Sequence, residues 1–203
     1  MIEGKRLAEI VGSGNVILDQ AALDEYSRDM SFVNAVRPAC VAKPGSADEV
    51  EKIVGLARET RTSLVPVSSG PPHFRGDTIP GSGGAVIVDL GRMKRIIRVD
   101  RENRVAMFEP GVTFGSLIAA VNKEGLRLNM PMAPRNTKSV VGSLLEREPV
   151  TMPKYHWDIA DPLNCVEVIF GTGEKFRTGA AAGPGPKAAE NRWAAGLKVK
   201  DSA

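Results

Sequence analysis

The sequence has few cysteines, and their spacing does not suit them to bind a metal or pair with each other. Its 203 residues include two, Cys40 and Cys165, which stand far apart and form no C-x-x-C pair. Neither a metal site nor a disulfide framework is therefore predicted. Both cysteines lie beside strand-like segments, and we interpret them as buried thiols.

Long hydrophobic runs and blocks of one charge are also absent. The apolar run at 86–90 is far shorter than the roughly 20 residues of a membrane-spanning helix, and the first residues do not lead into the apolar stretch of a signal peptide. We therefore expect a cytoplasmic location and no transmembrane segment. Lysines and arginines number 27 against 24 aspartates and glutamates, with no basic block, so dedicated nucleic-acid binding is not expected.

What the chain does contain is typical of a globular protein. Hydrophobic residues make up 42% and charged residues 25%, which suits one large domain or two small lobes. We predict N-terminal helices over 1–37 that pack on a first lobe over 38–94. A second lobe is predicted over 95–179, followed by a linker and C-terminal tail over 180–203.

The first lobe has a strand–helix–strand pattern. An apolar run at 38–42 predicts a strand, and Ser46 with Glu49 forms the S-x-x-E box that begins many helices. Further strands are predicted at 63–67 and 85–90. The last is apolar at nearly every position, which favours a parallel strand covered on both faces. The helix is expected to bury a stripe at helical spacing: Val50, Ile53, Val54 and Ala57.

The second lobe has the pattern of a mixed or antiparallel sheet. Thr113 begins a predicted helix that Gly125 ends. The stretch from 128 to 160 has little periodicity, and so long a segment without clear elements is interpreted as functional. Two hairpins are predicted, one from 95–99 with 104–109 and one from 164–170 with 174–178.

A loop with phosphate-binding chemistry follows the strand at 63–67. It reads Ser68-Ser69-Gly70-Pro71-Pro72-His73-Phe74. Sheets of α/β type place ligand-binding loops at the carboxyl ends of their strands, and hydroxyls with successive backbone N–H groups can surround a phosphate. Because two prolines remove N–H donors, a simple turn remains an open alternative.

Five segments in order carry a resemblance that covers most of the chain. From about Pro38 to Gly179 the chain resembles the FAD-binding domain of the vanillyl-alcohol oxidase / p-cresol methylhydroxylase superfamily, above all its glycolate and D-lactate dehydrogenase branch. The resemblance implies a two-lobed α+β fold, with a small parallel β/α lobe, a larger mixed or antiparallel β lobe with flanking helices, and FAD between them. The segments are Pro44-Gly45-Ser46, the loop at 68–77, Asp89-Leu90-Gly91-Arg92-Met93, Glu109-Pro110-Gly111-Val112-Thr113 and Ser139-Val140-Val141-Gly142-Ser143.

The resemblance also implies where FAD binds. Pro131, between Met130 and Met132, lies in a loop that either lines the isoalloxazine edge or packs in the core. Pro71 and Pro72 stand where the family usually has glycines, and Val141 stands where the family has the first glycine of its later turn. The family's pyrophosphate loop maps onto Ser68, Ser69, Gly70, Pro71, Pro72, His73 and Phe74. Its T-I-G-G-like turn maps onto Ser139, Val140, Gly142 and Ser143, which we expect to form a surface loop.

Two histidines leave their roles open. His73 stands where relatives with an S-G-G-H loop attach FAD covalently. The inserted proline favours non-covalent FAD, with His73 donating to phosphate or simply exposed. His156, between Tyr155 and Trp157, either acts as an acid or base toward flavin or substrate, or packs between the two aromatic rings.

The implied activity is that of a flavin-dependent oxidoreductase component that removes hydride from a hydroxy acid or similar alcohol. The sequence has no counterpart of the family's further glycine-rich passage or of its substrate cap. We therefore expect a partner polypeptide or a further domain to supply the cap, and we predict no catalytic residue. A non-catalytic scaffold of the same fold and an NADPH-dependent flavin reductase are the alternatives, and the two prolines favour the scaffold.

Overall fold

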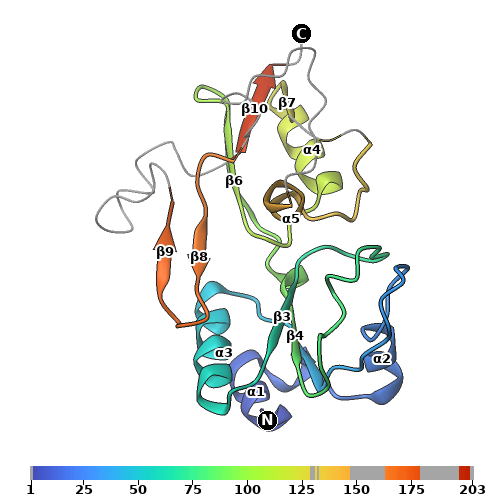
Figure 1. Ribbon diagram of the computed structural model, residues 1–203. Coiled ribbons are helices and arrows are strands. Elements are labelled where there is room, and N and C mark those ends of the chain that lie inside the picture. The colour runs from blue at the N-terminus through green and yellow to red at the C-terminus, as the bar shows by residue number, and fades with distance from the viewer. Residues whose placement is uncertain (1, 129–130, 132, 147–162, 179–196, 202–203) are drawn as a thin grey trace. The chain divides into compact units, whose positions relative to one another are not determined.

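A computed structural model describes residues 2–128, 131, 133–146, 163–178 and 197–201 (Figure 1). The chain divides into two compact units. Unit 1 comprises Met1–Met93 and Ile169–Glu174, and unit 2 comprises Lys94–Val168 and Lys175–Ala203. Each unit has its own sheet and its own hydrophobic core.

Unit 1 is built on a four-stranded sheet with the order β1-β2-β4-β3. Strand β1 (Val16–Ile17) is antiparallel to β2 (Cys40–Ala42), whereas β2, β4 (Val86–Asp89) and β3 (Leu64–Val67) are parallel. Three residues of β4, Val86 to Val88, are buried, as expected for an apolar strand between two neighbours. The predicted parallel β/α arrangement is confirmed.

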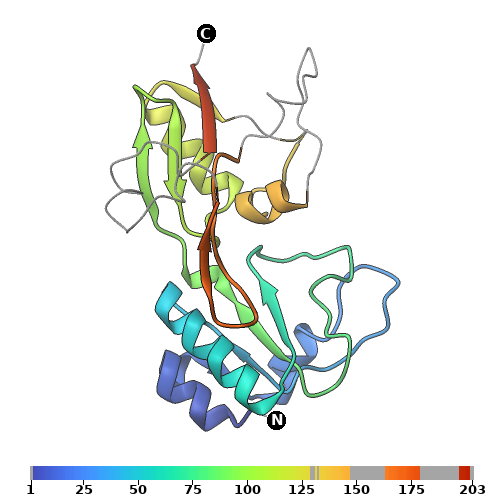
Figure 2. The ribbon, with the colours of Figure 1, turned by 60° about the vertical axis from the view of Figure 1, so that its left-hand side comes forward.

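Helices cover both faces of this sheet. Helices α1 (Gly4–Val11) and α3 (Ala47–Thr60) lie next to each other (Figure 2), and they share one core cluster with alternate residues of β2 and β4. Helix α2 (Gln20–Glu25) contributes Leu23 to the cluster on the other face. Strand residues point alternately to opposite faces, so each strand supplies both clusters.

Helix α3 begins as the sequence predicted, with two differences in detail. The hydroxyl of Ser46 accepts a hydrogen bond from the Glu49 N–H at 3.2 Å, but the Glu49 carboxylate accepts from the N–H of Gly45 at 2.7 Å. The buried face is Ile53, Leu56 and Ala57, whereas Val50 and Val54 of the predicted stripe are only partly buried. Leu56, three residues after Ile53, packs in the core cluster with residues of β2 and β4. The buried stripe of α3 is therefore rotated relative to the predicted one.

Unit 2 is built on a sheet with the order β5-β6-β10-β7. Strands β5 (Ile96–Asp100) and β6 (Val105–Phe108) form the predicted hairpin. Strand β10 (Leu197–Asp201) pairs with β6 and with β7 (Leu126–Leu128), and all three pairs are antiparallel. Helix α4 (Phe114–Lys123) buries Phe114, Leu117 and Val121 in the core of this unit. Strand β10 falls where the sequence analysis expected only linker and tail.

The remaining elements are short. Strands β8 (Glu167–Ile169) and β9 (Lys175–Arg177) form the second predicted hairpin, whose turn places Gly173 at a φ of 87°. Helix α5 (Val140–Leu145) lies within the stretch that had no predicted element. Within the described part of the chain, no helix has the length and apolarity needed to cross a membrane. The location in the cell stays a prediction.

Candidate functional site

The parallel strands of unit 1 end together and form what we call the carboxyl edge. In the register of this sheet Ala42 pairs with Val88, and Val67 pairs with Asp89. Lys43, Asp89 and Ser68 therefore stand next to each other where β2, β4 and β3 end. This is the edge at which open α/β sheets bind their ligands.

The predicted phosphate loop leaves this edge directly after β3. Ser68, Ser69, Gly70 and His73 are partly buried, whereas Pro71, Pro72 and Phe74 are exposed. The peptide bond between Pro71 and Pro72 is cis. The serines and Gly70 are thus less exposed to solvent than the two prolines that follow them.

A second loop clamps the far side of the phosphate loop. The N–H of Met30 donates to the carbonyl oxygen of His73 at 2.9 Å. The carboxylate of Asp29 accepts from the N–H of Gly76 at 2.6 Å and from the N–H of Ser31 at 2.8 Å. The bond between Asp29 and Gly76 joins residues 47 positions apart. No local sequence pattern therefore marks this contact, which we call the Asp29 clamp.

The environment of Asp29 favours its charged form. Desolvation raises the pKa of Asp29, but hydrogen bonds from Ser31 and Gly76 and the charge of His73 outweigh it and lower the pKa below its ordinary value. A carboxylate that accepts backbone N–H groups is stabilised when it is ionised. Asp29 therefore acts as a charged anchor for the start of the 76–80 segment.

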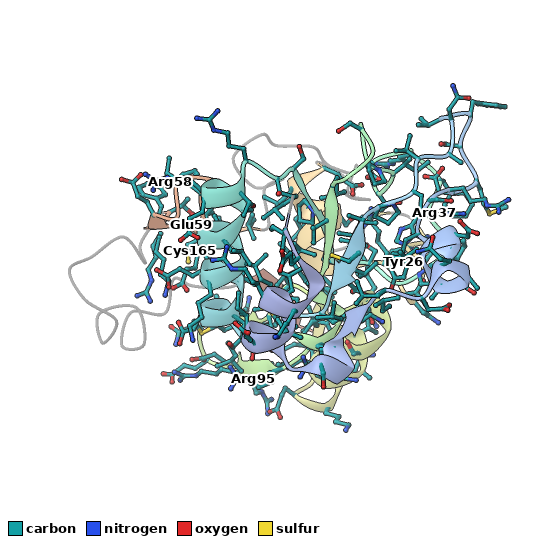
Figure 3. All side chains as sticks on the ribbon, turned by 90° about the horizontal axis from the view of Figure 1, so that it is seen from below. Tyr26, Arg37, Arg58, Glu59, Arg95 and Cys165 are labelled. Carbon is teal, nitrogen blue, oxygen red and sulfur yellow. The ribbon has the colours of Figure 1, made fainter. Side chains whose placement is uncertain are left out.

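A three-residue cluster occupies the carboxyl edge itself. The hydroxyl of Tyr26, which lies beside α2 in Figure 3, donates to Asp89 Oδ2 at 3.0 Å. Lys43 Nζ lies 3.8 Å from the same oxygen and 5.9 Å from the centre of the Tyr26 ring. Burial, and then the neighbouring Asp89, raise the pKa of Tyr26, so its hydroxyl remains a donor. In the sequence, Asp89 is visible only as part of a motif, and no local pattern marks Tyr26 or Lys43.

In unit 2, the structure brings two of the sequence motifs together. The hydroxyl of Ser139 donates to the carbonyl oxygen of Pro110 at 2.7 Å and accepts from the N–H of Gly142 at 3.0 Å. The N–H of Val140 donates to the carbonyl oxygen of Val112 at 3.0 Å. The segments 109–113 and 139–143 are therefore one structural feature, although residues 114–138 separate them in the chain.

The prediction that 139–143 is a surface loop is wrong. Ser139 precedes α5, and Ser139, Val140 and Ser143 are fully buried, whereas Gly142 is partly buried. The cause is Val140, whose side chain packs in the hydrophobic core of unit 2. The residues next to it in the chain are therefore buried as well. Pro131 is also buried. Met130, Met132, Tyr155, His156 and Trp157 lie outside the described residues.

The same unit holds a buried carboxylate next to this feature. Glu109 accepts from the N–H and the guanidinium of Arg95, in each case at 2.8 Å. Buried charges are tolerated when they are paired in this way. The pair fixes the start of the 109–113 segment to β5 and accounts for Glu109 as a structural residue.

The amino-acid sequence matches a known protein family. The sequence pattern of the family described as "FAD binding domain" matches residues 38–179. The chain belongs to this family. The match includes the three parallel strands of unit 1 and strands β5 to β9, and both candidate segments, 68–74 and 139–143, lie within it.

Three curated relatives with different activities are similar to this chain. This FAD-binding domain is 34% identical over 94% of its length to the 1'-carboxy-chondrochloren decarboxylase of Chondromyces crocatus. It is 27% identical over 93% to the flavoprotein subunit of 4-cresol dehydrogenase [hydroxylating] of Pseudomonas putida, and 27% identical over 86% to the glycolate oxidase subunit GlcD of Bacillus subtilis. The chain spans 35% to 37% of the length of these relatives.

A solved structure agrees with the fold. The crystal structure of p-cresol methylhydroxylase with substrate bound superimposes with a TM-score of 0.79 at 26% identity, over 96% of this chain and 38% of that one. The predicted α+β fold class and the predicted superfamily, vanillyl-alcohol oxidase / p-cresol methylhydroxylase, are thereby confirmed. FAD is the cofactor, as the family assignment shows.

Proposed function

We propose that this domain holds the diphosphate of FAD at the carboxyl edge of unit 1 and forms part of a flavin-dependent oxidoreductase. One observation carries the proposal. The loop at 68–74 leaves the end of β3 beside the central strand β4, and the Asp29 clamp holds its far side in place. A pre-formed loop binds a ligand with a smaller entropic cost than a mobile one.

The donor groups of the loop suit an anionic diphosphate. Ser68 and Ser69 supply hydroxyl and N–H donors, and Gly70 supplies an N–H that no side chain screens. Pro71 and Pro72 supply no N–H, but they are the exposed part of the loop. His73 and Phe74 complete the proposed diphosphate segment.

A second group of contacts is proposed in unit 2. It comprises Pro131, Ser139, Val140, Gly142 and Ser143. Because three of these residues are fully buried, we propose that they act through the backbone of the segment and through its fixed shape. The cofactor contacts of unit 1 and unit 2 can be tested separately by variants of each segment.

Thermal unfolding tests FAD binding by the 203-residue chain. A ligand that binds only the folded state stabilises it, by about 2.7 kcal/mol at a hundredfold excess over Kd. We expect saturating FAD to raise the Tm, and we expect a Ser69→Ala variant to show a smaller rise. A folded sample with no shift at saturating FAD would contradict the proposal and favour the non-catalytic scaffold.

We propose that FAD is held without a covalent bond. Pro71 and Pro72 change the spacing between Gly70 and His73 relative to an S-G-G-H loop, and the carbonyl oxygen of His73 is fixed by Met30. Acid precipitation of the FAD-loaded chain is expected to leave the flavin in the supernatant. Flavin colour that stays with the precipitate would show a covalent linkage.

The proposed reaction is oxidation of a hydroxy acid or similar alcohol. FAD, when bound, supplies the capacity to accept a hydride from the substrate carbon. The described residues of this chain bind and orient the cofactor, and a partner polypeptide or further domain is proposed to carry the substrate-binding residues. The glycolate oxidase subunit among the relatives supports a hydroxy-acid substrate, and the 4-cresol dehydrogenase flavoprotein subunit supports a partner subunit.

A further inference from the structure

The carboxyl edge of unit 1 contains a negative charge where a diphosphate is proposed to bind. Asp89 is the last residue of β4, and its backbone pairs with Val67, the residue directly before Ser68. Adjacent strands lie roughly 4.8 Å apart. The backbone of Asp89 therefore lies about one strand spacing from the end of β3, where the phosphate loop begins, and a negative charge in this region would repel an anionic ligand.

The contacts of Asp89 show how this charge is balanced. Its Oδ1 accepts from the N–H of Gly91 at 2.9 Å, and its Oδ2 accepts from the Tyr26 hydroxyl. Neither donor carries a net charge. Lys43 Nζ, 3.8 Å from Oδ2, is the cation that the structure places beside Asp89.

Lys43 is itself held at this position. It follows β2 directly, and its carbonyl oxygen accepts a hydrogen bond from Arg92 Nη1 at 2.6 Å. Its ammonium group lies over the Tyr26 ring, a favourable arrangement for a cation. The Lys43 side chain is 33% exposed and that of Asp89 is 20% exposed, so the pair is accessible to a ligand at this edge.

We propose that Lys43 is a charge-compensating residue of the FAD site, and that its pairing with Asp89 makes the carboxyl edge electrostatically acceptable to the diphosphate. The inference rests on the proposed diphosphate site at residues 68–74. It assigns Lys43 a positioning and electrostatic role through Asp89, and it assigns Tyr26 the role of orienting the carboxylate.

The test compares FAD affinity in charge variants of the full chain. Lys43→Met leaves Asp89 uncompensated, and we expect the Kd for FAD to rise about tenfold at low salt, the order expected for one uncompensated charge near a surface. The rise is expected to shrink at 1 M salt, where the Debye length is about 3 Å. Lys43→Arg keeps the charge and is expected to bind as the wild type does.

A double variant separates the electrostatic role from a structural one. Adding Asp89→Asn to Lys43→Met removes the repelling charge and is expected to restore affinity toward the wild-type value. Asp89→Asn alone is expected to bind FAD at least as tightly as the wild type. Arg6→Met, which removes an exposed cation paired with Glu59 in the same unit, is the matched control and is expected to leave the Kd unchanged.

Each other outcome is decisive. An unchanged Kd in Lys43→Met, or a loss that is equal at 1 M salt and is not restored by Asp89→Asn, overturns the compensating role. If Lys43→Met fails to fold, weaker FAD binding by Asp89→Asn alone overturns it. Absence of FAD binding by the wild-type chain would instead remove the proposed function, and this inference with it.

Discussion

Gly76 occupies a position that other residues could not take without rearrangement. Its φ is +73°, in the left-handed region, and an added Cβ would collide with the side chain of Val33. Its N–H also donates to Asp29. A single glycine thus lets the two loops of unit 1 approach closely enough to hydrogen bond.

Replacing Gly76 with alanine is expected to destabilise the protein. Left-handed backbone at a non-glycine residue costs on the order of 1 kcal/mol, and the collision with Val33 adds to this. We expect the free energy of unfolding in urea to fall by about 1–3 kcal/mol. Gly81→Ala is the control, because a Cβ there meets nothing within 4 Å. Equal stability of the two variants would contradict the clamp.

The lowered pKa of Asp29 predicts how stability depends on pH. The folded-state pKa lies below the ordinary value of 3.8, so the ionised carboxylate stabilises the fold at neutral pH, and this contribution is lost as the pH falls through the folded-state pKa. Asp29→Asn is expected to lower the Tm most at neutral pH and progressively less in acid. A Tm difference that is constant between neutral and acid pH would contradict this assignment.

Among the elements, α5 depends on one side chain at its start. Ser139 is fully buried and its hydroxyl joins Pro110 and Gly142. Ser139→Ala removes both hydrogen bonds and leaves a buried carbonyl oxygen without this donor, at an expected cost of about 1–2 kcal/mol. Urea unfolding measures the loss. Ser116→Ala, at an exposed position on α4, is expected to cost less, and an equal loss would contradict the role of Ser139.

The elements differ in how well the sequence predicted them. Strand β4 was predicted because its region contains four successive apolar residues, 85–88. Such a run is typical of an interior strand of a parallel sheet, which is covered on both faces. The start of α3 was predicted because Ser46 and Glu49 carry a local signal. Helix α5 was not, since its six residues include two valines and a glycine, which have weak helix propensity. Its stability comes from Ser139 and from burial, which are tertiary effects.

The candidate site was predictable only in part. Position relative to a buried strand identified the loop at 68–74. The Asp29 clamp and the Tyr26–Asp89–Lys43 cluster depend on contacts between segments 46 to 63 residues apart, for which no local pattern exists. Sequence reasoning thus locates the loop but not the groups that hold it or set its charge.

At the scale of the whole molecule, the proposal that a partner polypeptide or further domain carries the substrate-binding residues predicts slow substrate oxidation by this chain. The chain spans 35% to 37% of the relatives' length, and positioning a substrate against a cofactor contributes about 7–11 kcal/mol to catalysis. We expect the FAD-loaded chain to be reduced readily by dithionite but slowly by lactate or glycolate under anaerobic conditions. Loss of flavin absorbance measures both rates. Rapid reduction by a hydroxy acid would show that the chain needs no further part.

The two buried cysteines have a practical consequence for the two units. Cys40 lies in unit 1 and Cys165 in unit 2, and both are buried thiols, while burial raises the pKa of Cys40 to about 11. A thiol reagent can react with such a group only when the surrounding structure opens. Because the chain has no other cysteine, Cys40→Ala and Cys165→Ala variants would each leave one reporter. Labelling rates would then give the opening frequency of each unit separately.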